Sequence, residues 1–211
     1  MTNLKPFSLA NVLFTLFMSA VMGVPSAMSS ISKDPISTTD LSKGTGTVEF
    51  LAIGKPSALR IHGIGKEISG NFSVHGNLIE GSATFPLNTL ATGIDTRDHH
   101  MKEKYLETSK FPNATLRISK VALPHVIPAG DFSFKEIPFE GPLTLHGQTK
   151  NVRGTMTVAR AAGQMLVQAQ FGLKISDYAV SIPSFAGIVM ADEVNVDVHT
   201  NSPSQSSGTP K

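Results

Sequence analysis

Charged and imidazole side chains gather in the stretch from Gly93 to Pro112, which reads GIDTRDHHMKEKYLETSKFP. Arginine, aspartate and histidine side chains are able to move protons or bind a metal, so this stretch is the first candidate for a site. Consecutive residues of a helix diverge by about 100°. His99 and His100 therefore do not form the chelating pair that a spacing of four residues provides. We expect no metal and no cofactor here.

A catalytic role for Arg97, Asp98 and His100 would need partners in a recognisable arrangement. The sequence has no serine in a nucleophile elbow and no second carboxylate at a suitable spacing. The structural alternative is that Arg97 and Asp98 tie a helix to loop carbonyls and neighbouring strands, with Asp98 also reaching Lys102 four residues later. We favour the structural role, and catalysis with His100 as the base remains the alternative.

The same stretch has the pattern of one short amphipathic helix near 95–108. Asp95 is expected to cap its start, and Pro112 prevents its continuation. Met101 and Tyr105 lie four residues apart and form an apolar stripe, which we expect to pack on the body of the protein. The side chains expected to face water are Lys102, Glu103, Lys104 and Glu107.

An uncharged apolar run follows Lys5 and ends at the small residues around Ser26. This pattern predicts a secretory signal peptide over 1–29, because Gly23 and Pro25 break the helix where a peptidase would cut. An uncleaved membrane anchor is the alternative. We expect a periplasmic or secreted protein without stable membrane insertion after cleavage.

The composition restricts what the remaining chain can do. The 211 residues include no cysteine, which excludes disulfides, thiolate nucleophiles and cysteine-ligated metals. Without the predicted signal peptide the chain has 17 basic and 16 acidic residues. This balance lacks the basic excess of a nucleic-acid-binding surface, so we expect no nucleic acid as partner. The oligomeric state stays open, and a dimer is one of the possibilities.

Period-two alternation indicates that the domain over 46–200 is all-β. The clearest example is the segment from Gln164 to Ile175, in which apolar residues such as Phe171 alternate with polar ones such as Gln170. Eight or nine such runs follow one another, which favours an antiparallel meander. The length of the strands favours an extended eight-stranded barrel, which is able to enclose an apolar ligand. Residues 30–45 and 201–211 lack periodicity and are expected to be a flexible lead-in and a disordered tail.

Two motifs go beyond this patterning. The first is TGIDTRDHHM over 92–101, followed by Tyr105 and by Phe111-Pro112, and the second is LTLHGQTKNV over 143–152. Together they resemble the YceI-like family of periplasmic lipid-binding proteins. The resemblance implies a lipocalin-like barrel around a long apolar channel and no established catalytic activity. Polyisoprenoid chains are the ligands of some members, and quinones or fatty-acid derivatives are proposed for others. This chain departs from the family in having no tryptophan and in a proline-rich insert at 122–140.

The inward residues of the predicted strands are the candidate lining of a ligand channel. They are Phe72, Phe85, Leu145 and Phe171. By the resemblance, Arg97, Asp98 and His100 match the charged block of the family and complete the candidate ligand-binding residues. The leading interpretation is a carrier of an isoprenoid or similar long-chain lipid.

Two other functions remain open. The barrel could be filled with side chains, in an envelope structural or adhesion module, or the protein could be a lipid-modifying enzyme. The remaining histidines have no ligand spacing and are expected at the surface or rim. They are His62, His75, His125, His146 and His199.

Overall fold

The computed structural model describes residues 37–40, 45–55, 59–185 and 188–203, and all of them belong to one compact unit, Lys33–Lys211. The predicted signal peptide over 1–29 lies outside the described residues. Within them, no helix combines the length and the apolar character needed to cross a bilayer.

Nine antiparallel strands of seven residues or more make up most of the described chain. They are β2 (Thr45–Lys55), β3 (Arg60–Lys66), β4 (Ser69–His75), β5 (Leu78–Pro86), β6 (Asn113–Ala122), β7 (Phe132–Leu145), β8 (Gln148–Ala161), β9 (Gln164–Lys174) and β11 (Ile188–Pro203). The short strands β1 (Ser37–Asp40) and β10 (Ser184–Phe185) pair with β4 and β11. The ladder order is β1-β4-β5-β6-β7-β8-β9-β11-β2-β3.

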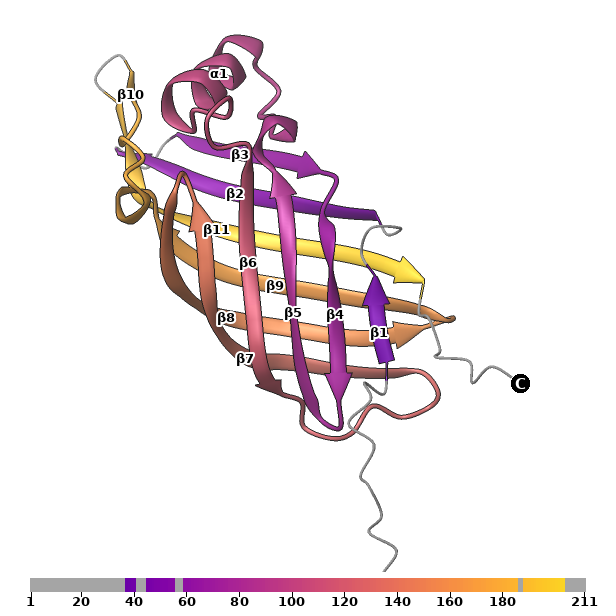
Figure 1. Ribbon diagram of the computed structural model, residues 1–211. Helices are drawn as coiled ribbons and strands as arrows, with labels where there is room; N and C mark the ends of the chain where they lie inside the picture. Colours follow the sequence, from indigo (N-terminus) through magenta and orange to yellow (C-terminus); the bar gives the residue numbers. More distant parts are fainter. Residues whose placement is uncertain (1–36, 41–44, 56–58, 186–187, 204–211) are drawn as a thin grey trace, which may run out of the picture. The chain divides into compact units, whose positions relative to one another are not determined.

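The sheet curls so that its two walls face each other across an apolar interior. In Figure 1, strands β4, β5 and β6 cross over strands β8, β9, β11 and β2 of the opposite wall. Among the nine long strands, β3 and β4 stand at opposite ends of the ladder, and they follow each other in the chain through a corner at Glu67 with φ 72°. This fold confirms the predicted antiparallel, lipocalin-like architecture. The described part has nine long strands instead of the predicted eight, and no ladder joins β3 to β4.

A pair of backbone hydrogen bonds also holds the curled sheet together beside β3. Ile64 exchanges both backbone hydrogen bonds with Ala91, at 2.9 and 2.8 Å. Ala91 follows the 3-10 turn η2 (Leu87–Thr89), and the Thr89 hydroxyl lies 2.9 Å from the Lys66 carbonyl oxygen. The segment between β5 and the helix is thereby held against the free edge of β3.

Three predicted segment boundaries need correction. The lead-in over 30–45 contains β1, which pairs with residues 71–74 of β4, and β11 continues to Pro203 within the predicted tail. Residues 132–140 of the insert over 122–140 belong to strand β7. A register shift between Phe134 and Ile137 interrupts the period-two pattern there, and this bulge is the reason that only the last part of the strand, around Leu145, was predicted from the sequence.

Strand β3 presents glycines to the interior because two aromatic rings need the space. A Cβ atom at Gly63 would lie 2.1 Å from a ring carbon of Phe50, and one at Gly65 would lie 2.2 Å from a ring carbon of Phe85. Glycine at both positions thus lets the two rings approach the backbone of β3 closely.

The predicted short helix near 95–108 is confirmed, although it is shorter. It consists of α1 (Asp95–His100) and a π-helical turn, η3 (Met101–Tyr105), together called the helix segment below. Figure 1 shows α1 at one end of the curled sheet, beside the end of β5. The prediction that Asp95 caps the helix is wrong, since the N-cap residue is Ile94 and makes no side-chain cap. A further 3-10 turn, η4 (Ile175–Tyr178), follows β9.

Candidate functional site

A cavity of about 710 Å³ lies inside the curled sheet. Its volume falls within the roughly 300–1,000 Å³ that is typical of small-molecule sites. The structure brings together on this cavity the four apolar residues singled out from the sequence. They are Phe72, Phe85, Leu145 and Phe171, and all four are buried.

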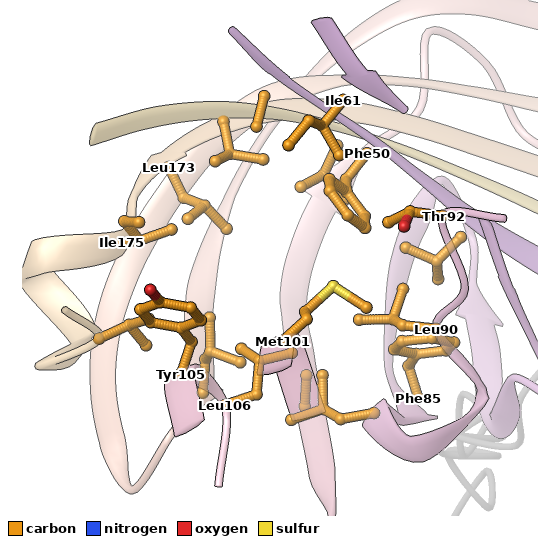
Figure 2. Close-up of a pocket in the computed structure, with 18 of the residues that line it drawn as sticks. Phe50, Ile61, Phe85, Leu90, Thr92, Met101, Tyr105, Leu106, Leu173 and Ile175 are labelled. Atoms are coloured by element: carbon orange, nitrogen blue, oxygen red, sulfur yellow. The ribbon is translucent and has the colours of Figure 1, made fainter. Parts of the chain in front are cut away.

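The inner faces of several strands supply the lining of the cavity. On β9, Phe171 is only 8% exposed and lines the cavity, whereas its neighbour Gln170 is exposed to solvent. The period-two alternation therefore assigned the two faces of this strand correctly. Figure 2 shows Phe50 of β2 and Leu173 of β9 pointing into the same space.

The helix segment closes one side of this space. Met101 and Tyr105 pack against the core as their spacing predicted, and Leu106 joins them. In Figure 2 these three side chains face Leu173 and Ile175 across the cavity. The polar lining residues from this part of the chain are Thr92, Thr96, Arg97, His100 and Lys104.

Arg97 and Asp98 form a clasp around Thr92. The Arg97 Nε atom donates to the Thr92 hydroxyl oxygen at 2.6 Å, and Nη2 donates to the Thr92 carbonyl oxygen at 2.9 Å. The Asp98 carboxylate accepts the Thr92 backbone N–H at 2.8 Å and also the Thr92 hydroxyl. Both charged side chains therefore secure the residue at which the chain turns into the helix.

The clasp holds the pKa of the Asp98 carboxyl below its usual value. Desolvation raises this pKa, but the two hydrogen bonds from Thr92, with smaller effects of Lys102 and Arg97, outweigh it. The interactions are local to the start of the helix. The predicted bond to a loop carbonyl is thus present, while among the described residues Arg97 and Asp98 show no side-chain hydrogen bond to a neighbouring strand.

His146 is the polar residue that sequence reasoning missed. It was expected at the surface or rim, yet it is only 9% exposed. Its Nδ1 atom lies 3.0 Å from the Tyr178 carbonyl oxygen, and its Nε2 atom lies 3.0 Å from a carboxylate oxygen of Glu107. Its ring also contacts the ring of Phe111, with 4.5 Å between the centroids. Glu107, which was expected to face water, is therefore held against the protein.

No periodicity or spacing in the sequence predicts the hydrogen bonds of His146, because the bonded residues are far apart in the chain. Glu107 is 39 residues from His146, and Tyr178 is 32 residues away on the other side. The one local signal is the dipeptide His146-Gly147 after an alternating strand, which indicates a hairpin turn. Both residues have positive φ, as such a turn requires.

Metal binding finds no support in the part of the chain that the structure describes. No group of three or more histidine, cysteine, aspartate or glutamate residues is close enough there to hold an ion. His100 is exposed at the edge of the cavity beside the ring of His99. The arrangement as a whole is suited to enclosing an apolar molecule. The basic side chains that line the cavity all come from the helix segment.

A curled antiparallel sheet around an apolar cavity, with a short helix beside one end, defines the lipocalin-like class of β-barrels. Residues 40–202 match the YceI-like domain, and the chain belongs to this family. No curated protein matches it.

Two solved structures share this fold. One is a polyisoprenoid binding domain from Saccharophagus degradans implicated in plant cell wall breakdown, with 19% identity and a TM-score of 0.59, covering 82% of this chain and 100% of that domain. The other is BcnA of Burkholderia cenocepacia, with 20% identity and a TM-score of 0.57, covering 74% of this chain and 96% of the other. At these identities the likeness supports the fold alone.

Proposed function

We propose that this protein is a periplasmic or secreted carrier that holds one long-chain apolar lipid in its cavity. Polyisoprenoids, quinones and fatty-acid derivatives are the ligand classes considered. The observation that carries the proposal is the cavity of about 710 Å³, whose walls are the apolar inner faces of the strands. The polyisoprenoid binding domain of Saccharophagus degradans, which shares the fold, adds support.

The energetics of such a site favour the lipid tail. Each methylene group transferred from water to an apolar cavity contributes about 0.8 kcal/mol, before the losses caused by immobilising the ligand. One charge-assisted hydrogen bond to a head group adds about 1.5–3 kcal/mol. A long tail therefore sets most of the affinity, and the head group sets selectivity.

The two alternatives from the sequence receive less support. A structural module with a filled barrel does not account for a cavity of this size. A lipid-modifying enzyme would need a positioned base. The hydrogen bonds that Arg97 and Asp98 make go to Thr92 rather than to His100, so neither of them orients the His100 ring for proton transfer. Binding without catalysis is the simpler proposal.

Native mass spectrometry of protein purified from the cell envelope without detergent tests the carrier function. We expect a lipid to co-purify with the wild-type protein. Phe171→Asp, which places a carboxylate in the cavity, is the matched variant and should lose the lipid. A wild-type protein that is empty and takes up no added lipid would contradict the proposal, and turnover of the bound lipid would favour the enzyme.

The proposed location depends on the predicted signal peptide over 1–29. The intact mass of the protein isolated from the envelope reports its first residue. A mature N-terminus near 24–31 is expected, because the small and helix-breaking residues there suit a signal peptidase. Retention of Met1 would instead favour an uncleaved anchor.

A further inference from the structure

The charged side chains on the cavity wall all have the same sign. Arg97 and Lys104 line the cavity, and His100 lies between them on the helix segment. Among the described residues, no aspartate or glutamate lines the cavity. The apolar interior thus has one polar region, and that region is basic.

Arg97 and Lys104 both have N–H groups that make no hydrogen bond within the described part of the chain. Arg97 donates to Thr92 through Nε and Nη2, which leaves Nη1, one of the three nitrogens of its guanidinium, for another acceptor. Lys104 Nζ lies 5.4 Å from the centroid of the Tyr105 ring. In the described part of the chain Lys104 has no carboxylate within ion-pair distance.

The acidic residues nearby leave Lys104 without a paired carboxylate, whereas the charge of Asp98 does interact with that of Arg97. The Asp98 carboxylate is occupied by two hydrogen bonds from Thr92, and the Glu107 carboxylate is held by Lys110 and His146. Glu103 is exposed and does not line the cavity. A ligand that fills the cavity would therefore lie against Lys104, which has no paired carboxylate in the described part of the chain.

We infer that the ligand is an amphiphile with an anionic head group, a carboxylate or a phosphate, bound at Arg97 and Lys104 with its tail in the cavity. This inference rests on the proposed carrier function and adds the chemistry of the head. An anion receives charge-assisted hydrogen bonds from both side chains. A neutral head of the same size would bury part of both cations without neutralising them, which is unfavourable.

Three probes of equal chain length separate the head from the tail. Palmitate, hexadecyl phosphate and hexadecanol are each titrated into delipidated full-length mature protein at a pH that ionises the carboxylic acid. We expect both anions to bind about tenfold or more tightly than the alcohol. Added salt should reduce this advantage, because it screens exposed charges. A preference between the two anions identifies a phosphorylated or a carboxylate lipid as the source.

Substitutions on the helix segment test the assignment of the site. Lys104→Gln should remove most of the advantage of palmitate over hexadecanol, because it weakens palmitate binding and relieves the cost of covering a cation with the neutral alcohol. Lys102→Gln is the matched control, since it removes the same charge from the same segment but does not line the cavity. Arg97→Gln should act like Lys104→Gln, with thermal stability measured in parallel because Arg97 also holds Thr92.

The outcomes distinguish the two proposals. Equal affinity for the three probes, or an equal effect of the Lys102 and Lys104 substitutions, would overturn the anionic head group while leaving the carrier function intact. Failure of all three probes to bind would also overturn the anionic head group, and only together with an empty wild-type protein in native mass spectrometry would it overturn the carrier function.

Discussion

His146 and Glu107 are joined by a hydrogen bond of 3.0 Å between Nε2 and a carboxylate oxygen, while Nδ1 of the same ring faces the Tyr178 carbonyl oxygen. Each ring nitrogen of His146 therefore lies within hydrogen-bond distance of one oxygen acceptor. The ring connects three segments that are distant in sequence. Leu106 and Leu145, which adjoin Glu107 and His146, line the cavity, as does Val180, two residues after Tyr178.

His146→Gln should lower the free energy of unfolding by about 1–3 kcal/mol, because a glutamine amide cannot donate to both acceptors in this geometry. Urea unfolding monitored by circular dichroism measures the change. His125→Gln serves as the control, since His125 is exposed, and it should leave the midpoint near that of the wild type. Equal midpoints for the two variants would show that the buried contacts add no stability.

The stabilising contribution of Glu107 should be lost in acid. The pKa of its carboxyl lies below the ordinary value of 4.5, first because of the hydrogen bond from Lys110 and then because of that from His146. A lowered pKa in the folded state means that the stabilisation is present above the unfolded value and is lost as the pH falls through the folded value.

Glu107→Gln should therefore be less stable than the wild type at neutral pH and should lose less stability on acidification. Thermal melting across a pH series from neutral to strongly acid measures both effects. Glu103→Gln, on the exposed face of the same segment, should keep the wild-type pH dependence. The interpretation fails if Glu107→Gln and the wild type lose stability in parallel below the ordinary pKa.

Arg97→Ala should destabilise the protein by about 1–3 kcal/mol, since it removes both hydrogen bonds to Thr92 from a partly buried site. Arg153→Ala is the comparison, because Arg153 makes an exposed ion pair with Glu140 and such pairs contribute little. Differential scanning calorimetry of both variants gives the result. Unchanged stability of Arg97→Ala with loss of ligand binding would assign Arg97 to the ligand alone.

Phe171→Asp and Gln170→Asp each replace one of two neighbouring residues, which lie on opposite faces of β9. The first places an unpaired carboxylate in the cavity, which is strongly unfavourable, and should both abolish lipid retention and weaken the fold. The second adds a charge to an exposed face and should do neither. Lipid content by mass spectrometry and stability by urea unfolding measure the two effects. The opposite ranking would reverse the assigned faces and remove the basis of the cavity.

The parts of the fold that the sequence predicted are those governed by local periodicity. Phe171 and Gln170 were assigned to opposite faces because side chains alternate along any extended strand. Met101 and Tyr105 were assigned to one stripe because residues four apart share a helix face. Strand β7 was missed where its bulge between Phe134 and Ile137 breaks the alternation on which such a prediction depends.

The candidate site was predicted in composition but not in geometry. The apolar residues Phe72 and Leu145 were identified as inward facing, but single-strand patterns do not tell whether opposite walls meet or leave a space between them. Whether a space remains between the walls depends on the curvature of the sheet and on the glycines at positions 63 and 65, which make room for aromatic rings. The volume of the cavity is therefore a property of the assembled walls.

By itself, the amino-acid sequence determined that this protein is an antiparallel β domain with one short helix, since alternation and helix spacing are short-range properties. Only the tertiary structure decided that His146 is buried between Glu107 and Tyr178, and that the basic residues Arg97 and Lys104 border one apolar cavity. These contacts join residues from separate turns of the chain. Their energies depend on distance and burial, which arise only when the sheet curls and the helix segment packs against it.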